Sequence, residues 1–219
     1  MSLLEFAKGP ALNFALVVFL VGVLWRLLGI ALMRFVHPHT EARSSFGKAA
    51  AGGLRTVGSR SWPHPEFVSR TGYGEALGYS YHIGLIVVVL FFAPHVQFFK
   101  SLFGVEWASL PSGWIDVISI VTVALLIAVL LRRLTNPVLK RISNFDDYFS
   151  WFVTVLVLVT GILATLHLGG PYETLLALHI LSFNLLLIWF PFGKLMHAFF
   201  IVPSRWINGY FLNRKGAAS

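Results

Sequence analysis

The sequence lacks cysteine altogether, and only 12% of its 219 residues are charged. Without cysteine the chain forms no disulfides and offers no thiolate ligand to zinc or to an iron–sulfur cluster, so a metal must be bound through histidine or carboxylate side chains. A soluble domain has about 25% charged residues, whereas this chain is 57% hydrophobic with a mean hydropathy of +0.76. One protein interior cannot bury so many apolar side chains. Many of them must therefore face lipid.

Acidic residues are scarce as well, because nine Asp and Glu stand against 17 Lys and Arg, for a formal net charge of +8. Such a charge can indicate nucleic-acid binding, but here the cations lie between apolar runs, as membrane-flanking charges do. We therefore expect lipid, and no nucleic acid, as a partner. The segment Met1 to Lys8 contains Glu5 and no clear small-residue cleavage site, so we expect no removed signal peptide.

Five apolar segments are each long enough to cross a hydrocarbon layer of about 30 Å as a helix. They comprise residues 11–33, 79–99, 114–132, 148–168 and 173–201. Their apolar residues are continuous rather than alternating, which favours helices over strands. The sequence therefore predicts an all-α integral membrane protein with five transmembrane helices, forming one domain over residues 1–219.

Lys and Arg are distributed unequally between the two sets of loops. The segments 34–78, 133–147 and 202–219 contain twelve of them, whereas the segments 1–10, 100–113 and 169–172 contain only Lys8 and Lys100. Because cytoplasmic loops are enriched in Lys and Arg, we expect the N-terminus outside and the C-terminus inside. The inner loop 34–78 is longer than a connector needs. We interpret this loop and the tail 202–219 as docking segments for a soluble partner, with a loop lying on lipid as the alternative.

Histidine is the most informative residue type. Five of the eight histidines lie within or at the edges of predicted spans, where ionisable side chains are costly and indicate function. These five are His82, His95, His167, His179 and His197. The others, which we expect to be solvated in the inner loop, are His37, His39 and His64.

The directions of the helices sort the histidines by depth. His82 and His197 fall near the inner surface, whereas His95 and His179 fall near the outer surface. His179 and His197 are 18 residues apart, about five turns of an ideal helix, so both imidazoles would point from one face. Two facing histidines at each of two levels are what two b haems require, since each takes one axial nitrogen from either side. We therefore predict a haem-binding helical bundle.

The second span fits less well, because His82 and His95 would lie about 140° apart around an ideal helix. Pro94, directly before His95, offers a means of turning the outer end. His167, at the outer end of the fourth span, is a rival ligand for the outer haem. Gly84 and Gly161 would give a porphyrin a helix face without side chains, although close helix packing through small residues is the alternative.

Several motifs carry a family resemblance. They are His82-Ile83-Gly84, Asp146-Asp147 with Thr160-Gly161, Leu178-His179, and Phe190-Pro191-Phe192-Gly193-Lys194-Leu195-Met196-His197 with Pro203. Together with the five-helix, N-out layout over most of residues 10–210, they resemble the gamma subunit of respiratory nitrate reductase. The resemblance implies two b haems in a bacterial or archaeal cytoplasmic membrane. His82 and His197 would bind the inner haem, and His95 and His179 the outer haem.

The sequence departs from the nitrate reductase subunits in two features, and both favour membership among the relatives of those subunits. In those subunits the second histidine of helix two follows the first more closely than His95 follows His82 here, and their first inner loop is shorter. Both features look more like the membrane cytochromes of heterodisulfide-reductase-like or sulfite-reduction complexes. The resemblance therefore supports a di-haem cytochrome more strongly than it supports nitrate as the terminal substrate.

The implied activity is electron transfer between the quinone pool and a cytoplasmic partner with an iron–sulfur subunit and a catalytic subunit. A quinol site needs a proton acceptor near the outer haem, for which Asp116 is the first candidate and Lys100 the second. Arg26 and Lys194 are candidates to pair with haem propionates. A solvated interfacial charge is the alternative for each acceptor. For the whole chain, the alternatives are a transporter with a histidine proton path and a haem-free membrane anchor.

Overall fold

The computed structural model describes residues 1–32, 41–63 and 65–217, so the loop histidines His37, His39 and His64 lie outside the described ranges. Within these ranges the chain is helical, and the only β-type pairing is an isolated bridge between Phe92 and Leu110. The elements are α1 (Leu3–Phe6), η1 (Ala7–Ala11), α2 (Leu12–Ala31), α3 (Phe46–Ser59), α4 (Val68–Phe91), α5 (Ala93–Phe103), α6 (Ser112–Thr135), α7 (Pro137–Ile142), α8 (Phe145–Leu166), α9 (Tyr172–Trp189), η2 (Lys194–Met196) and α10 (His197–Arg214).

Within the described residues, five helical stretches are long and apolar enough to cross a membrane. They are Leu3–Ala31, Val68–Phe91, Ser112–Thr135, Phe145–Thr165 and Tyr172–Trp189. The all-α class and the five candidate spans predicted from the sequence are thus confirmed, and the chain is a multi-pass membrane protein. The orientation of the chain in the membrane stays a prediction.

The predicted bounds were wrong in two places that matter for the histidines. The second span does not continue to residue 99, because α4 ends at Phe91 and the extended Phe92 separates it from α5, in which Pro94 occupies the first turn. The fifth span does not continue to residue 201, because α9 ends at Trp189 and α10 begins only at His197. His179 and His197 therefore lie on different helices rather than on one face of a single helix.

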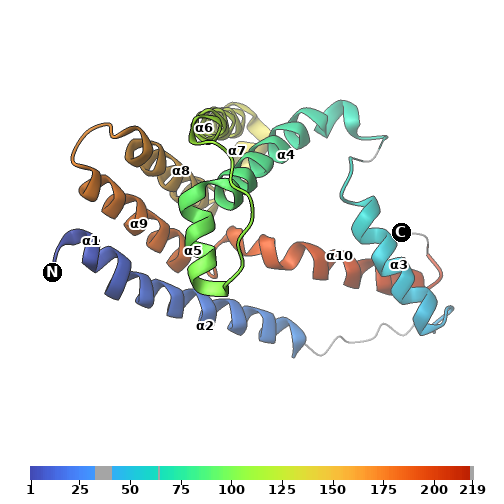
Figure 1. Ribbon diagram of the computed structural model, residues 1–219. Coiled ribbons are helices and arrows are strands. Elements are labelled where there is room, and N and C mark those ends of the chain that lie inside the picture. The colour runs from blue at the N-terminus through green and yellow to red at the C-terminus, as the bar shows by residue number, and fades with distance from the viewer. Residues whose placement is uncertain (33–40, 64, 218–219) are drawn as a thin grey trace.

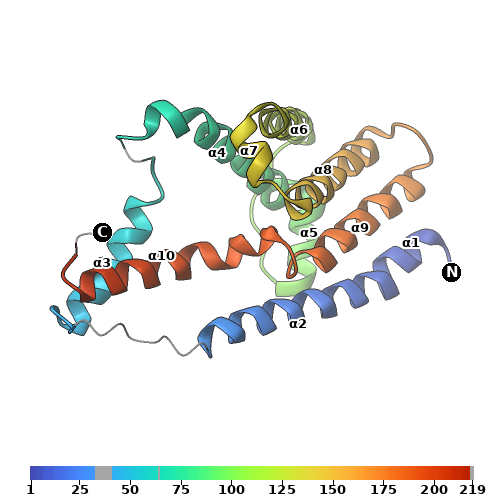
Figure 2. The ribbon, with the colours of Figure 1, turned by 180° about the vertical axis from the view of Figure 1, so that it is seen from behind.

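The predicted inner loop 34–78 contains more helix than a connector would. It includes α3, which begins after the N-cap Ser45, and the first turns of α4. In both views α10 runs away from the end of α9 and packs along α3, at the side of the molecule opposite the N-terminus (Figures 1 and 2). The structure thus brings the two predicted docking segments together as one helix pair.

The remaining helices form the bundle that carries the histidines. Helix α8 packs against α9 and α6, α4 packs against α6, and α2 packs against α9 (Figure 1). A small apolar core joins α4, α6 and α8 through Val88, Ile115, Leu126 and Leu158. Many large apolar side chains are exposed on the first three candidate spans, among them Trp25, Ile86 and Ile120, as expected for helices that face lipid.

Candidate functional site

In the described part of the chain, two pairs of histidine rings lie close to each other. The ring centres of His82 on α4 and His197 at the start of α10 are 5.9 Å apart, with the ring planes at 88°. The ring centres of His95 on α5 and His179 on α9 are 6.2 Å apart, with the planes at 17°. These are the two pairs that the sequence predicted from depth, and we refer to them as the His82–His197 pair and the His95–His179 pair.

The same ring nitrogen is engaged in all four histidines. Nδ1 of His82 lies 2.7 Å from the carbonyl oxygen of Gly78, and Nδ1 of His197 lies 2.7 Å from that of Lys194. Nδ1 of His95 and Nδ1 of His179 each lie 3.1 Å from a backbone carbonyl as well. Since a carbonyl can only accept, Nδ1 carries the proton in these contacts, which leaves the lone pair of Nε2 free to bind a metal.

The spacing of the rings fits a metal between them. A metal–imidazole bond of about 2 Å places each ring centre roughly 3 Å from the metal, so two opposed imidazoles on one metal have centres about 6 Å apart. Both interplanar angles are compatible with this geometry, because the metal fixes the direction of each bond and not the rotation of the ring about it. Within the described residues no group of three or more His, Asp or Glu forms a metal site. Two protein ligands per site suit a haem, whose porphyrin supplies the other four nitrogens.

The break between α4 and α5 explains how His95 reaches its place. The last carbonyls of a helix have no partner within the helix. At the end of α4 these carbonyls accept hydrogen bonds from the segment that follows: Val88 from the His95 ring at 3.1 Å, Leu90 from Trp107 Nε1 at 2.5 Å, and Phe91 from the backbone N–H of Leu110 at 2.8 Å. The chain thus leaves the helix at Phe92, two residues before Pro94, and because His82 and His95 lie on separate helices the 140° conflict of a single ideal helix does not arise.

His167 lies in a different environment from the two pairs. It ends α8 in the left-handed conformation, with φ of 55°, and its ring stacks on Tyr172 with a centre-to-centre distance of 5.1 Å. The ring that faces His179 belongs to His95. The geometry therefore favours His95 over His167 as the partner of His179.

The two glycines singled out in the sequence lie against protein atoms. A Cβ at Gly84 would overlap the hydroxyl of Thr122 on α6, so this glycine allows α4 and α6 to approach closely. A Cβ at Gly161 would lie 3.1 Å from Cε1 of His179. The missing side chain of Gly161 thus leaves room on α8 for the His179 ring, whose Nδ1 contacts the carbonyl of Val157 one turn earlier. The structure favours the packing alternative for Gly84 and gives Gly161 a contact with a candidate ligand.

The candidate quinone residues are not joined by a hydrogen bond or an ion pair in the described part of the chain. Asp116 lies partly buried in the second turn of α6. Lys100, in the last turn of α5, forms an exposed ion pair with Glu106. A quinone site at Asp116 and Lys100 stays a prediction.

The candidate propionate partners have protein contacts of their own. Arg26 on α2 lies over the ring of Phe200 on α10, with its guanidinium carbon 5.7 Å from the ring centre. The Lys194 ammonium pairs with Asp147 at the start of α8. Sequence reasoning named Asp146 and Asp147 only among the motifs of the family resemblance and did not connect them with Lys194. The signal was indirect, because both segments occurred among the motifs of the family resemblance.

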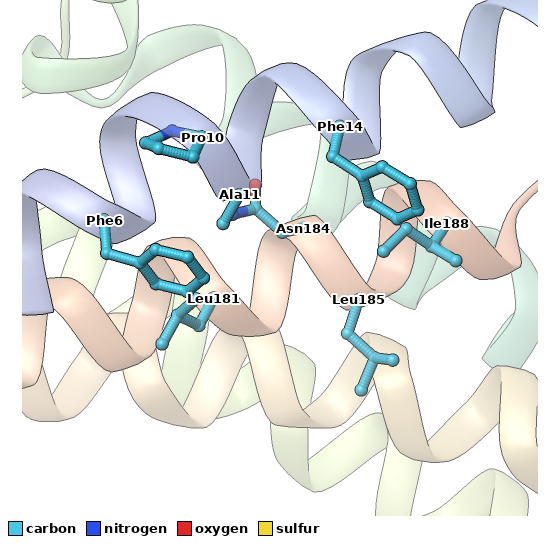
Figure 3. Close-up of a pocket in the computed structure, with 8 residues that line it drawn as sticks. All are labelled: Phe6, Pro10, Ala11, Phe14, Leu181, Asn184, Leu185 and Ile188. Carbon is cyan, nitrogen blue, oxygen red and sulfur yellow. The ribbon is translucent and has the colours of Figure 1, made fainter.

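A groove of about 420 Å³ lies between the N-terminal helical stretch Leu3–Ala31 and α9 (Figure 3). It is lined mainly by apolar side chains, among them Phe6, Phe14 and Leu181, with Asn184 as its polar member. The buried Asn184 donates from Nδ2 to the carbonyl of Ala7, at the start of the π-helical turn that contains Pro10. Sequence reasoning missed this contact, which accounts for a polar side chain within the fifth span.

A protein of Nitratidesulfovibrio vulgaris (strain Hildenborough) is 32% identical to this chain over 222 aligned residues, which cover 97% of the chain and 95% of that protein. The chain therefore belongs to the same family as this Nitratidesulfovibrio protein, whose name, "Protein", specifies no activity. No family model matches the sequence. No solved structure matches it either.

Proposed function

We propose that the chain is the membrane cytochrome b subunit of a respiratory oxidoreductase. It would bind two b haems and connect the quinone pool with a cytoplasmic partner that holds iron–sulfur clusters and a catalytic subunit. The observation that carries the proposal is the presence of two opposed histidine pairs with ring centres 5.9 and 6.2 Å apart, each ring anchored through Nδ1. When bound, the haems would supply one-electron carriers across the membrane.

The residues of the chain have distinct parts in this proposal. His82 and His197 would hold the inner haem, and His95 and His179 would hold the outer haem, each through Nε2. Their Nδ1–H bonds to carbonyls fix the ring orientations and raise the basicity of the ligating nitrogens. At the outer end, Asp116 accepts a proton when a quinol is oxidised or returns one when a quinone is reduced.

The helix pair α3–α10 is the proposed docking surface for the partner. Gly209 of α10 approaches α3 so closely that a Cβ there would overlap Thr56. Lys48, Arg55 and Arg60 of α3 and its C-cap are exposed. A basic surface of this kind complements an acidic partner and accelerates its association. The iron–sulfur clusters of the proposed complex must lie in that partner, because this chain has no cysteine to bind them.

Haem stoichiometry and spectra test the proposal. The chain, produced in a haem-competent host and purified in mild detergent, should give two b haems per chain in a pyridine haemochrome assay, with b-type bands in reduced-minus-oxidised spectra. A chain with one haem or none would contradict the proposal. A colourless chain that still co-purified with a soluble enzyme would be a haem-free anchor, and a colourless chain that moved protons in vesicles would be a transporter.

A further inference from the structure

Lys194 uses all three of its polar groups at the break between α9 and α10. Its backbone N–H donates to Oδ1 of Asp146 at 3.0 Å, and its ammonium donates to Oδ2 of Asp147 at 2.5 Å. Its carbonyl oxygen lies 2.7 Å from Nδ1 of His197. One residue thus connects two carboxylates at the start of α8 with a candidate haem ligand on α10.

Asp146 also holds the other side of the break. Its Oδ1 accepts a hydrogen bond from the Ser150 hydroxyl at 2.7 Å, and that hydroxyl accepts one from Nε1 of Trp189, the last residue of α9, at 2.9 Å. A Cβ at Gly193 would collide with both Trp189 and Asp146, so the glycine allows the chain to pass close to the carboxylate. The first two turns of α8 therefore fix both the end of α9 and the start of η2.

Asp147 is surrounded by cations from two further elements. Its side chain is 8% exposed and pairs with Arg133 of α6 at 3.0 Å as well as with Lys194. Arg133 in turn donates to the Ser143 hydroxyl at 2.7 Å. A carboxylate this buried needs its cations, so Asp147 restrains the Lys194 side chain while Asp146 restrains its backbone.

We infer that Asp146 and Asp147 position the His197 imidazole through Lys194 and so tune the inner haem. The inference rests on the proposed function. Because a ligating histidine is oriented and made more basic by the acceptor of its second N–H, a carbonyl that moves changes the ligand. A less basic ligand stabilises ferric iron less, so loosening the Lys194 carbonyl raises the midpoint potential of the inner haem and weakens its retention.

The test compares Asp146→Ala with Asp146→Asn in the haem-loaded chain. Asparagine removes the charge but keeps an oxygen that can accept from the Lys194 N–H, whereas alanine removes both. We expect alanine to raise the inner-haem potential, change its low-spin ferric EPR signal and weaken inner-haem retention roughly tenfold or more. Asparagine should stay near the wild type. The outer haem is the internal reference, and Glu5→Ala, which removes a first-turn carboxylate from α1, is the matched control.

Each outcome decides the matter. Equal shifts with Ala and Asn would show that the charge of Asp146 acts and not its contact with the Lys194 N–H, and would overturn the inference. Unchanged inner-haem properties in both variants would also overturn it, while two haems in the wild type would uphold the proposed function. A wild-type chain without haem would overturn both. If Asp146→Ala lost both haems, Ser150→Ala would decide: a change confined to the inner haem supports the positioning role, and any other result contradicts it.

Discussion

The two histidine pairs have nearly equal ring separations, 5.9 and 6.2 Å, but the chain anchors them in different ways. In the His82–His197 pair, each Nδ1 contacts a carbonyl three or four residues earlier in its own turn. In the His95–His179 pair, each Nδ1 contacts a carbonyl of another helix, α4 for His95 on α5 and α8 for His179 on α9. One pair is anchored locally and the other by tertiary contacts.

Because the two pairs are anchored differently, different contacts determine where their rings lie. A local anchor orients the ring within its turn but does not place the turn in space, and His197 is exposed at the first residue of α10. Its position therefore depends on the contacts of Lys194 with α8. The His95–His179 pair is placed by the packing of α8 against α9 and by the turn between α4 and α5. Damage to either set of contacts should affect only one pair.

The largest expected effect is the loss of one haem on removal of one ligand. We expect His197→Ala to lose the inner haem and keep much of the outer one, and His179→Ala to do the reverse, because neither pair shares a ligand with the other. Haem stoichiometry combined with redox titration measures this. Two haems with unchanged spectra in the His197 variant would show that the inner ligand is assigned wrongly.

A second pair of substitutions tests the choice between His95 and His167. His95→Ala should remove the outer haem, because its ring is the one that faces His179. His167→Ala should keep both haems, since the His167 ring stacks on Tyr172. Redox titration of the outer haem distinguishes the two variants. Loss of that haem in the His167 variant alone would move the ligand to the end of α8.

A smaller effect is expected from filling the space beside the His179 ring. In Gly161→Leu the new side chain would begin 3.1 Å from His179 Cε1, so the ring must shift and its contact with the Val157 carbonyl must weaken. We expect a substantial fall in outer-haem occupancy with the inner haem retained. Gly29→Leu is the matched control, because a Cβ at Gly29 meets nothing within 4 Å. Equal losses in both variants would point to general destabilisation of the membrane helices.

The sequence predicted the elements well where apolar length alone decides them. All five candidate spans were recognised, because about 20 apolar residues can satisfy their backbone in lipid only as a helix. The ends of two spans were wrong, because α5 and the segment after Trp189 are apolar enough to extend a hydropathy run although the backbone leaves the helix there. Proline marked both places, at Pro94 and Pro191, but a proline indicates a disturbance and not the direction of the chain beyond it.

The pairing of the histidines was predictable because residue counting gives the depth of each histidine along its span even where the helix is interrupted. Residue counting placed His82 near His197 and His95 near His179, and the rings meet in those pairs. The supporting contacts were not predictable in this way. The Lys194 contacts join residues 47 and 48 positions apart in the sequence, and the role of Gly161 depends on which side chain of α9 faces α8. Such contacts follow from the rotation of packed helices, which the low amphipathicity of membrane helices leaves unspecified.

The smallest expected effect concerns the Thr160 hydroxyl on α8, and it tests how far the His95–His179 pair relies on tertiary contacts. The hydroxyl lies 3.4 Å from Nδ1 of His179 and 2.8 Å from the hydroxyl of Ser182 on α9. Thr160→Val keeps the volume but removes this polar bridge, so the His179 ring keeps only its carbonyl anchor. A contact this long contributes about 0.5 kcal/mol, which corresponds to a shift of roughly 20 mV in the outer-haem potential. Redox titration beside Thr154→Val, a control that removes a hydroxyl bonded within α8 to the Ser150 carbonyl, measures the shift. A displacement of the inner haem instead would contradict the separation of the two pairs.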